Sequence, residues 1–94
     1  MKEQFKGYLI KRGYNEFTPS GNPSTAYSYV KYIDRVCEWE CIEWSELADN
    51  IDVIIDLYDI GGAKEEQGNM SKRTCINALK RFSEFLPTYK GAMR

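Results

Sequence analysis

The segment SKRTCINALKRFSEFL, residues 71–86, decides the fold because its apolar and polar residues separate onto two sides of an α-helix. Helical positions advance by about 100° per residue, so residues three and four apart share a side. The apolar side is predicted to comprise Cys75, Ala78, Leu79, Phe82 and Leu86, flanked by Ile76 and Phe85. The opposite side carries Arg73, Asn77, Lys80 and Arg81, with Glu84 as its acidic member.

The ends of this helix are predicted from Ser71 and Pro87. The Ser71 hydroxyl can accept a hydrogen bond from an unpaired amide of the first turn, which makes this residue a candidate N-cap. Pro87 is expected to end the helix, because proline disfavours helical geometry in the residue before it. Such a helix is either a core element with a solvated outer side, or an element that presents cations and an amide to a nucleic acid.

Composition limits the classes of protein to which the chain can belong. Its 94 residues, 43% of them hydrophobic, are enough for one domain with a single modest core. Its apolar runs are too short to cross a membrane, and its amphipathic start does not resemble a secretory signal, so a cytoplasmic protein is expected. With three cysteines and no histidine, we expect no disulfide framework, no metal site and no cofactor.

Charge is unevenly distributed along the chain, although the net charge is only −1. Residues 1–14 carry four cations against Glu3, and residues 70–94 carry six against Glu84. Residues 34–59 carry nine acids against Arg35. This asymmetry permits a basic surface that binds a polyanion, even in a chain that is nearly neutral.

Periodicity and turn residues predict an all-α domain over residues 1–87, a compact bundle of four principal helices. The first helix covers 2–12 and is closed by Gly13, and the second begins at Asn22-Pro23. The third is broken at Asn50 into 45–49 and 51–59. A polar loop over 63–70 precedes the last helix, and residues 88–94 form a basic, frayed tail. The predicted core of the second and third helices comprises Ala26, Tyr29, Val30, Ile33, Val36, Cys37, Leu47, Ile51, Ile54, Ile55 and Tyr58.

Three short motifs occur in a recognisable order. Residues 5–9 read FKGYL, residues 25–33 read TAYSYVKYI, and residues 71–85 place Ser, Thr, Leu and two Phe at 71, 74, 79, 82 and 85. In this order the motifs resemble the core-binding domain of tyrosine recombinases, also called the phage-integrase N-terminal SAM-like domain. The resemblance covers nearly the whole chain and implies a small four-helix bundle.

The resemblance implies that the second and last helices face duplex DNA. Carried over by position, the candidate DNA-binding residues are Ser24, Thr25, Ser28, Lys31, Ser71, Lys72, Arg73, Thr74, Asn77, Lys80 and Arg81. The catalytic domain of that family, with its tyrosine nucleophile and its arginine and histidine residues, has no counterpart in 94 residues. We therefore expect a non-catalytic domain, either a stand-alone relative from a mobile element or part of a longer recombinase.

The acidic third helix departs from the family, whose members are usually more basic. Its candidate stripe consists of Asp49, Asp52, Asp56 and Asp59. The alternative interpretation is a protein-interaction module or small inhibitor that binds a basic partner or mimics a nucleic acid. Each of these charged helix sides can also be a solvent-exposed surface that binds no partner. Catalysis is not expected, because no histidine is available to activate Cys37 or Cys41.

Overall fold

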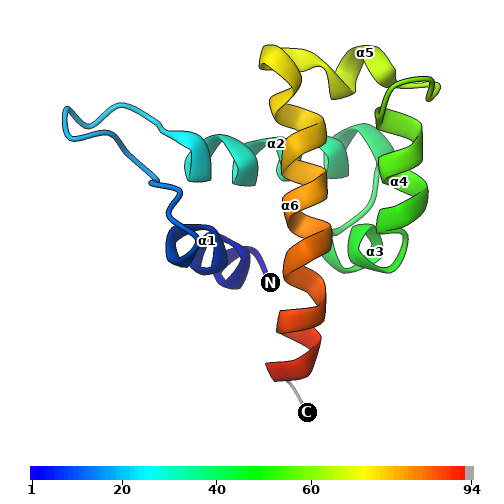
Figure 1. Ribbon diagram of the computed structural model, residues 1–94. Helices are drawn as coiled ribbons and strands as arrows, with labels where there is room; N and C mark the ends of the chain where they lie inside the picture. The colour runs from blue at the N-terminus through cyan, green and yellow to red at the C-terminus, as the bar shows by residue number, and fades with distance from the viewer. Residues whose placement is uncertain (93–94) are drawn as a thin grey trace.

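A computed structural model describes residues 1–92, with side chains placed through Tyr89. Within these residues the secondary structure is helical, apart from one isolated bridge between Phe17 and Pro23. The helices, shown in Figure 1, are α1 (Lys2–Lys11), α2 (Thr25–Glu40), α3 (Trp44–Asp49), α4 (Ile51–Tyr58), α5 (Glu65–Gly68) and α6 (Met70–Ala92). The all-α prediction is confirmed, and so is the break at Asn50.

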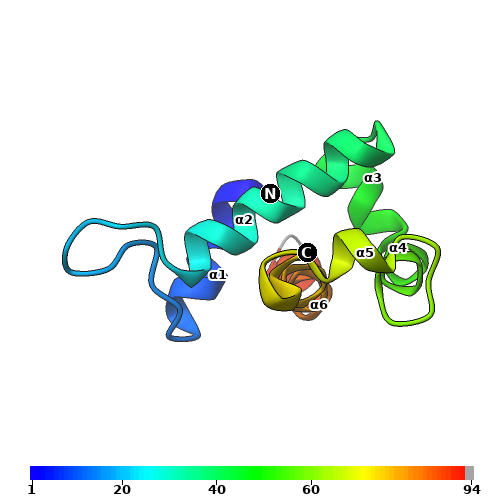
Figure 2. The same ribbon diagram turned by 90° about the horizontal axis from the view of Figure 1, so that it is seen from above.

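The last helix, α6, is the element around which the others are arranged. It crosses α2, with α1 on one side and α3 and α4 on the other (Figures 1 and 2). It packs most extensively against α2 and also contacts α1, α3, α4 and α5. Each of the other helices therefore packs against this one element.

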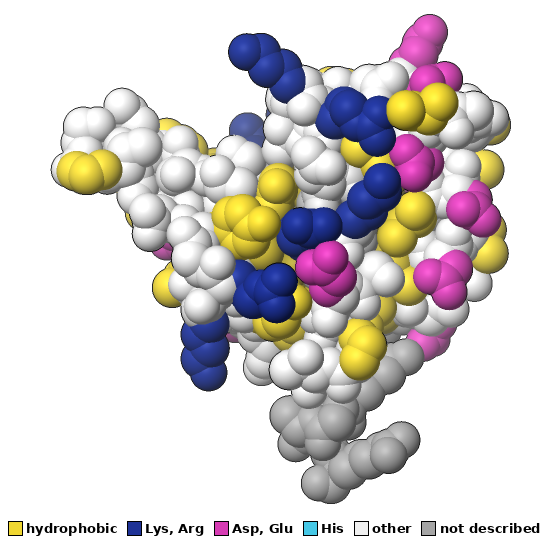
Figure 3. Space-filling view, in the orientation of Figure 1, with side chains coloured by type: hydrophobic (Ala, Val, Ile, Leu, Met, Phe, Trp, Pro, Cys, Tyr) yellow, Lys and Arg dark blue, Asp and Glu magenta, His cyan; other side chains and the backbone are white. Residues whose placement is uncertain are grey.

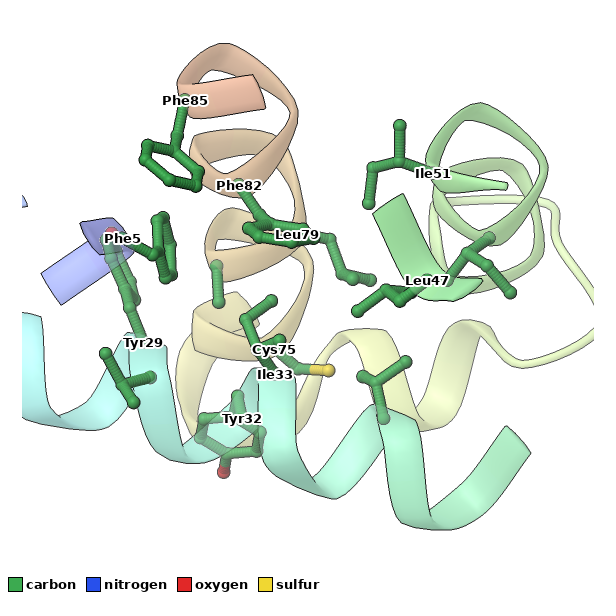
Figure 4. Close-up of a cluster of buried hydrophobic side chains, with 14 of the residues drawn as sticks. Phe5, Tyr29, Tyr32, Ile33, Leu47, Ile51, Cys75, Leu79, Phe82 and Phe85 are labelled. Atoms are coloured by element: carbon green, nitrogen blue, oxygen red, sulfur yellow. The ribbon is translucent and has the colours of Figure 1, made fainter. Parts of the chain in front are cut away.

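Aromatic rings occupy the centre of the core, as Figure 4 shows. Phe5 of α1 lies 5.2 Å from Phe82 and 5.5 Å from Phe85, measured between ring centroids. Trp44 of α3 approaches Phe82 at 5.5 Å in an edge-to-face arrangement. Pairs in this range add about 0.5–1.5 kcal/mol beyond the burial of their area. The first helix, the third helix and α6 are thus joined through one ring, that of Phe82.

The predicted core is largely confirmed. All seven apolar residues predicted for the last helix are buried, and so are the six predicted for α2. Ile55 is only partly buried, and Tyr32, which was not predicted, belongs to the core. Helical periodicity identified these positions because each helix buries one continuous side.

A second set of contacts joins the end of α2 to α4 and α5. Tyr58 is wholly buried, and its hydroxyl donates to the Glu40 carboxylate at 2.9 Å. Lys64 forms an ion pair with the same carboxylate. Gly68 lies so close to Tyr58 that a Cβ at this position would overlap the Tyr58 carbonyl oxygen. The predicted polar loop over 63–70 is therefore wrong in part, because a helical turn, α5, packs against Tyr58.

The predicted start of the second helix at Asn22-Pro23 is wrong by two residues. Asn22 belongs to the preceding turn, where its amide donates to the Thr18 hydroxyl at 3.1 Å and its carbonyl accepts from the Thr18 amide at 2.8 Å. Ser24 instead occupies the N-cap position, in an extended conformation. The turn over residues 18–22 thus includes Asn22, which the sequence pattern had placed at the start of the second helix.

The predicted N-cap at Ser71 is also wrong. Ser71, Lys72 and Arg73 all adopt left-handed backbone conformations, with φ of 54°, 58° and 69°. The Ser71 hydroxyl pairs with the Tyr32 hydroxyl at 2.5 Å instead of capping a helix. Left-handed geometry costs a non-glycine residue roughly 1–2 kcal/mol. Tertiary contacts of this segment with α2 offset part of that cost.

The predicted end of the last helix at Pro87 is wrong, because α6 continues to Ala92. A proline inside a helix removes one backbone hydrogen bond. Continuing the helix brings Tyr89 against Phe85, with ring centroids 5.4 Å apart, so further apolar surface is buried. Of the predicted tail, residues 88–92 are therefore helical, and residues 93–94 lie outside the described part of the chain.

The Glu40 carboxylate should make stability depend on pH. Desolvation tends to raise its pKa, but hydrogen bonds from Lys64 and Tyr58 outweigh that effect and hold the pKa below its ordinary value of 4.5. Stability from a depressed carboxyl pKa is present above the unfolded value and is lost as pH falls through the folded one. Glu40→Gln removes the charge that pairs with Lys64, so we expect it to lower the free energy of unfolding by about 1–2 kcal/mol near neutral pH. The loss is limited to this size because Lys64 is partly solvated.

Urea unfolding at about pH 7 and about pH 2 measures this effect. The difference between wild type and Glu40→Gln should shrink at the lower pH. The exposed neighbour Glu38, changed to Gln, is the matched control and should show little effect at either pH. A difference for Glu40→Gln that stays constant over this range would contradict the assignment.

Candidate nucleic-acid interface

Hydroxyl side chains gather where the start of α2 meets the start of α6. Ser24, Thr25, Ser28 and Thr74 line one hollow, together with Tyr29 and Pro23. Thr74 is distant from the others in sequence, and it joins them because α6 crosses α2. The hollow thus unites four of the predicted DNA-binding residues. Ser24 makes no capping hydrogen bond through its side chain, whereas the Thr74 hydroxyl donates to the Ser71 carbonyl oxygen.

Arg81 extends this surface along α6. Its guanidinium lies beside Tyr14 and Tyr29, and the Tyr14 hydroxyl is the main cause that raises the pKa of Arg81. Its Nη2 pairs with Glu84 at 3.1 Å, while its enclosed Nε has no hydrogen-bond partner among the described residues. Since Tyr29 also lines the hydroxyl hollow, the Arg81 cation adjoins that hollow.

Further cations lie on the outward side of α6 and in its left-handed first segment, residues 71–73. Lys72 is exposed and forms no ion pair within the described part of the chain. Arg73 and Lys80 both pair with Asp59, which follows α4, at 3.2 Å and 3.3 Å. Figure 3 shows Lys and Arg side chains gathered over α6, with acidic side chains beside them over α4 and α5. The cationic surface therefore borders the acidic one along a line of ion pairs.

The Asp59 carboxylate at this border has a lowered pKa and therefore stays ionised. The Ile60 amide donates to its carboxylate at 2.8 Å and is the main cause that lowers the pKa of Asp59. Lys80 and Arg73 lower the pKa further. One carboxylate thus partly neutralises two of the predicted DNA-binding cations.

The remaining predicted DNA-binding residues lie in different surroundings. Asn77 is exposed on the outward side of α6, between Thr74 and Arg81. Ser71 is exposed as a residue, but its hydroxyl is engaged by Tyr32. Lys31 lines a separate hollow between α1 and α2, next to Lys2 and Asp34. The structure therefore does not bring Lys31 together with the cations of α6.

Two cations that sequence reasoning did not assign to the site are Lys11 and Arg12. Both are exposed at the end of α1, and the Arg12 guanidinium lies 5.7 Å from the centroid of the Tyr8 ring. Figure 3 shows cationic side chains continuing from α6 towards the position of α1 in Figure 1. The signal in the sequence was the basic character of residues 1–14.

The predicted acidic stripe is divided in the structure. Asp49, Asp52 and Asp56 are exposed on α3 and α4. Asp59 is only partly exposed and faces the cations of α6. The open part of the stripe therefore contains three carboxylates, and the fourth belongs to the border with the cationic surface.

The buried cysteines are poorly suited to nucleophilic chemistry. Desolvation is the main cause that raises the pKa of both the Cys37 and the Cys75 thiol to about 11. Both are therefore protonated near neutral pH, and the thiolate is the reactive form. Among the described residues, no group of three or more His, Cys, Asp or Glu side chains is placed to hold a metal ion.

Within the described residues, none of the helices combines the length and the apolar character that crossing a membrane requires. No family model, curated protein or solved structure matches the chain.

Proposed function

We propose that this protein binds duplex DNA without catalysing a reaction, through the hydroxyl hollow and the outward side of α6. The observation that carries the proposal is the continuity of these two features. Thr74 belongs to both, and Arg81 adjoins the hollow through Tyr29. No other described surface joins predicted DNA-binding residues from both α2 and α6.

The chemistry of this surface suits a phosphate backbone. Serine and threonine hydroxyls donate hydrogen bonds to phosphate oxygens, and Lys and Arg neutralise their charge. Ser24, Thr25 and Ser28 would contact one part of the backbone, and the α6 cations another. Asn77 projects from the same side, and an asparagine side chain can bond an adenine edge in the major groove. The proposed contact is thus mainly to the backbone, with one candidate for reading bases.

Binding must compete with the ion pairs already present. A phosphate that approaches Arg73 or Lys80 has to replace the Asp59 carboxylate, and one that approaches Arg81 has to replace Glu84. Partly exposed ion pairs of this kind contribute about 0–1 kcal/mol each. The exchange is therefore feasible, and it should make the affinity moderate.

The likeness of the motifs to recombinase core-binding domains, from which the candidate residues were carried over, also supports the proposal. In that family the corresponding helices grip one side of the duplex. A role in DNA recombination follows as part of the proposal, with any catalysis supplied by a separate domain. The DNA contact itself does not depend on that role and can be tested with the isolated chain.

Fluorescence anisotropy with a labelled DNA duplex tests the proposal. With about four phosphate contacts, the logarithm of the binding constant should fall with the logarithm of salt concentration with a slope of about −3.6. The double variant Arg73→Gln/Lys80→Gln should weaken binding at least tenfold and reduce the magnitude of this slope by about 2. Circular dichroism confirms that the variant remains folded.

The matched control is Lys2→Gln/Lys31→Gln, which removes the same charge from the separate hollow between α1 and α2. This variant should bind within about twofold of wild type if the proposed surface makes the contact. Equal losses for the two double variants would show a general effect of charge. That result, or an absence of DNA binding by the wild type at low salt, would refute the proposed interface.

Asp59→Asn should have the opposite effect and strengthen DNA binding. The substitution releases Arg73 and Lys80 from their shared carboxylate, while the new carboxamide keeps an oxygen that can still accept from the Ile60 amide. Two ion pairs of this kind correspond to roughly three- to tenfold in affinity. The same anisotropy assay measures the change.

Asp52→Asn makes the same change in net charge on the exposed side of α4 and serves as the control. We expect it to alter affinity less than Asp59→Asn does. An equal gain for the two variants would mean that net charge alone controls the affinity. Weaker binding by Asp59→Asn would show that DNA does not use the cations that Asp59 holds.

A further inference from the structure

An apolar strip remains uncovered at α4 and the residues that follow it. Val53 has an exposed fraction of 61%, and Ile60, just after the helix, has 68%. Leu57 lies four residues after Val53, so these two share a side of α4, and Leu57 is only partly buried. Figure 3 shows hydrophobic side chains at this edge of the molecule, interspersed with acidic ones. Val53 and Ile60 therefore lie mostly outside the core.

Carboxylates flank the apolar strip. Asp52 and Asp56 project from α4 on the side next to Val53, and Asp49 projects from α3. None of the three pairs with a cation among the described side chains. Like charges four residues apart on a helix repel each other, so Asp52 and Asp56 do not help the helix to form. Val53, Ile60 and the three carboxylates are therefore largely left in water, whereas Leu57 packs partly against the core.

We propose that this surface, formed by Val53, Leu57, Ile60, Asp49, Asp52 and Asp56, docks a basic amphipathic helix of a partner protein. The apolar side of such a helix would cover Val53 and Ile60, and its flanking Lys or Arg residues would pair with the aspartates. Amphipathic helices commonly bind by this combination of apolar anchors and complementary charge. The inference is independent of DNA binding, because the acidic surface repels a polyanion and involves none of the α6 cations.

Charge complementarity is the reason for choosing this occupant. An apolar ligand alone would leave three desolvated carboxylates without partners, which is costly. A basic peptide without an apolar side would leave Val53 and Ile60 in water. A helix that carries both features covers the apolar side chains and pairs with the carboxylates. The positions of the three carboxylates also fix the orientation of the bound helix.

A synthetic peptide of about 14 residues tests the inference, since about that length is needed for a helix to persist in water. It carries Leu on one helical side, flanked by Lys and Arg, and its fluorescence anisotropy is followed as the whole protein is added. The control peptide has the same composition, scrambled so that no apolar side forms. We expect the amphipathic peptide to bind at least tenfold more tightly than the scrambled one.

Two variants of the protein locate the contact. Val53→Ser/Ile60→Ser should reduce peptide binding at least tenfold, and Asp52→Asn/Asp56→Asn should do the same. The control Ile10→Ser removes an exposed apolar side chain from α1 and should leave binding unchanged. Equal binding of the two peptides, or failure of both double variants to weaken it, would overturn the inference.

Sedimentation velocity at several protein concentrations separates this occupant from a second copy of the chain. We expect a monomer whose mass does not depend on Val53 or Ile60. A dimer that dissociates in Val53→Ser/Ile60→Ser would assign the surface to self-association and overturn the proposed partner.

Discussion

The packing of α6 around Phe82 is the interaction on which the rest of the structure depends. The Phe82 ring contacts Phe5 of α1 and Trp44 of α3, while neighbouring residues of α6 pack against α2 and α4. Loss of a buried phenylalanine typically costs about 3–5 kcal/mol, a large share of the stability of a small domain. Because the apolar side of α6 is buried by this packing, the opposite side of the helix faces outward. The crossing of α6 over α2 also places Thr74 beside Ser24 and Ser28.

Asp59 separates the two surfaces for which functions are proposed. It follows the acidic helix α4, yet its carboxylate pairs with Arg73 and Lys80 on the cationic surface. A nearly neutral chain can thus keep a basic and an acidic surface side by side, with one carboxylate at the border. Ligands of opposite charge would then bind on either side of it without sharing a contact residue.

Helical periodicity was sufficient to predict the buried sides of α2 and α6, because these follow from local spacing. The break between α3 and α4 was predicted from Asn50 itself. The helix ends were harder to predict because tertiary contacts decide them. Tyr32 engages the Ser71 hydroxyl, and the contact of Tyr89 with Phe85 favours continuation past Pro87. The residue types of the candidate site could be predicted from the sequence, but which of these residues lie together could not. Lys31 falls in a separate hollow, because α2 turns it away from α6.

Backbone NMR of the isotopically labelled protein, titrated with duplex DNA, tests the central claim most directly, since the side of α6 opposite Phe82 is the proposed contact. Amide shift changes should concentrate at residues 24–28 and 72–81, which together form the hydroxyl hollow and the outward side of α6. The amides of α4 should change little. Shift changes centred on Lys31 and α1, or on α4, would contradict the account, as would a titration that leaves residues 72–81 unaffected.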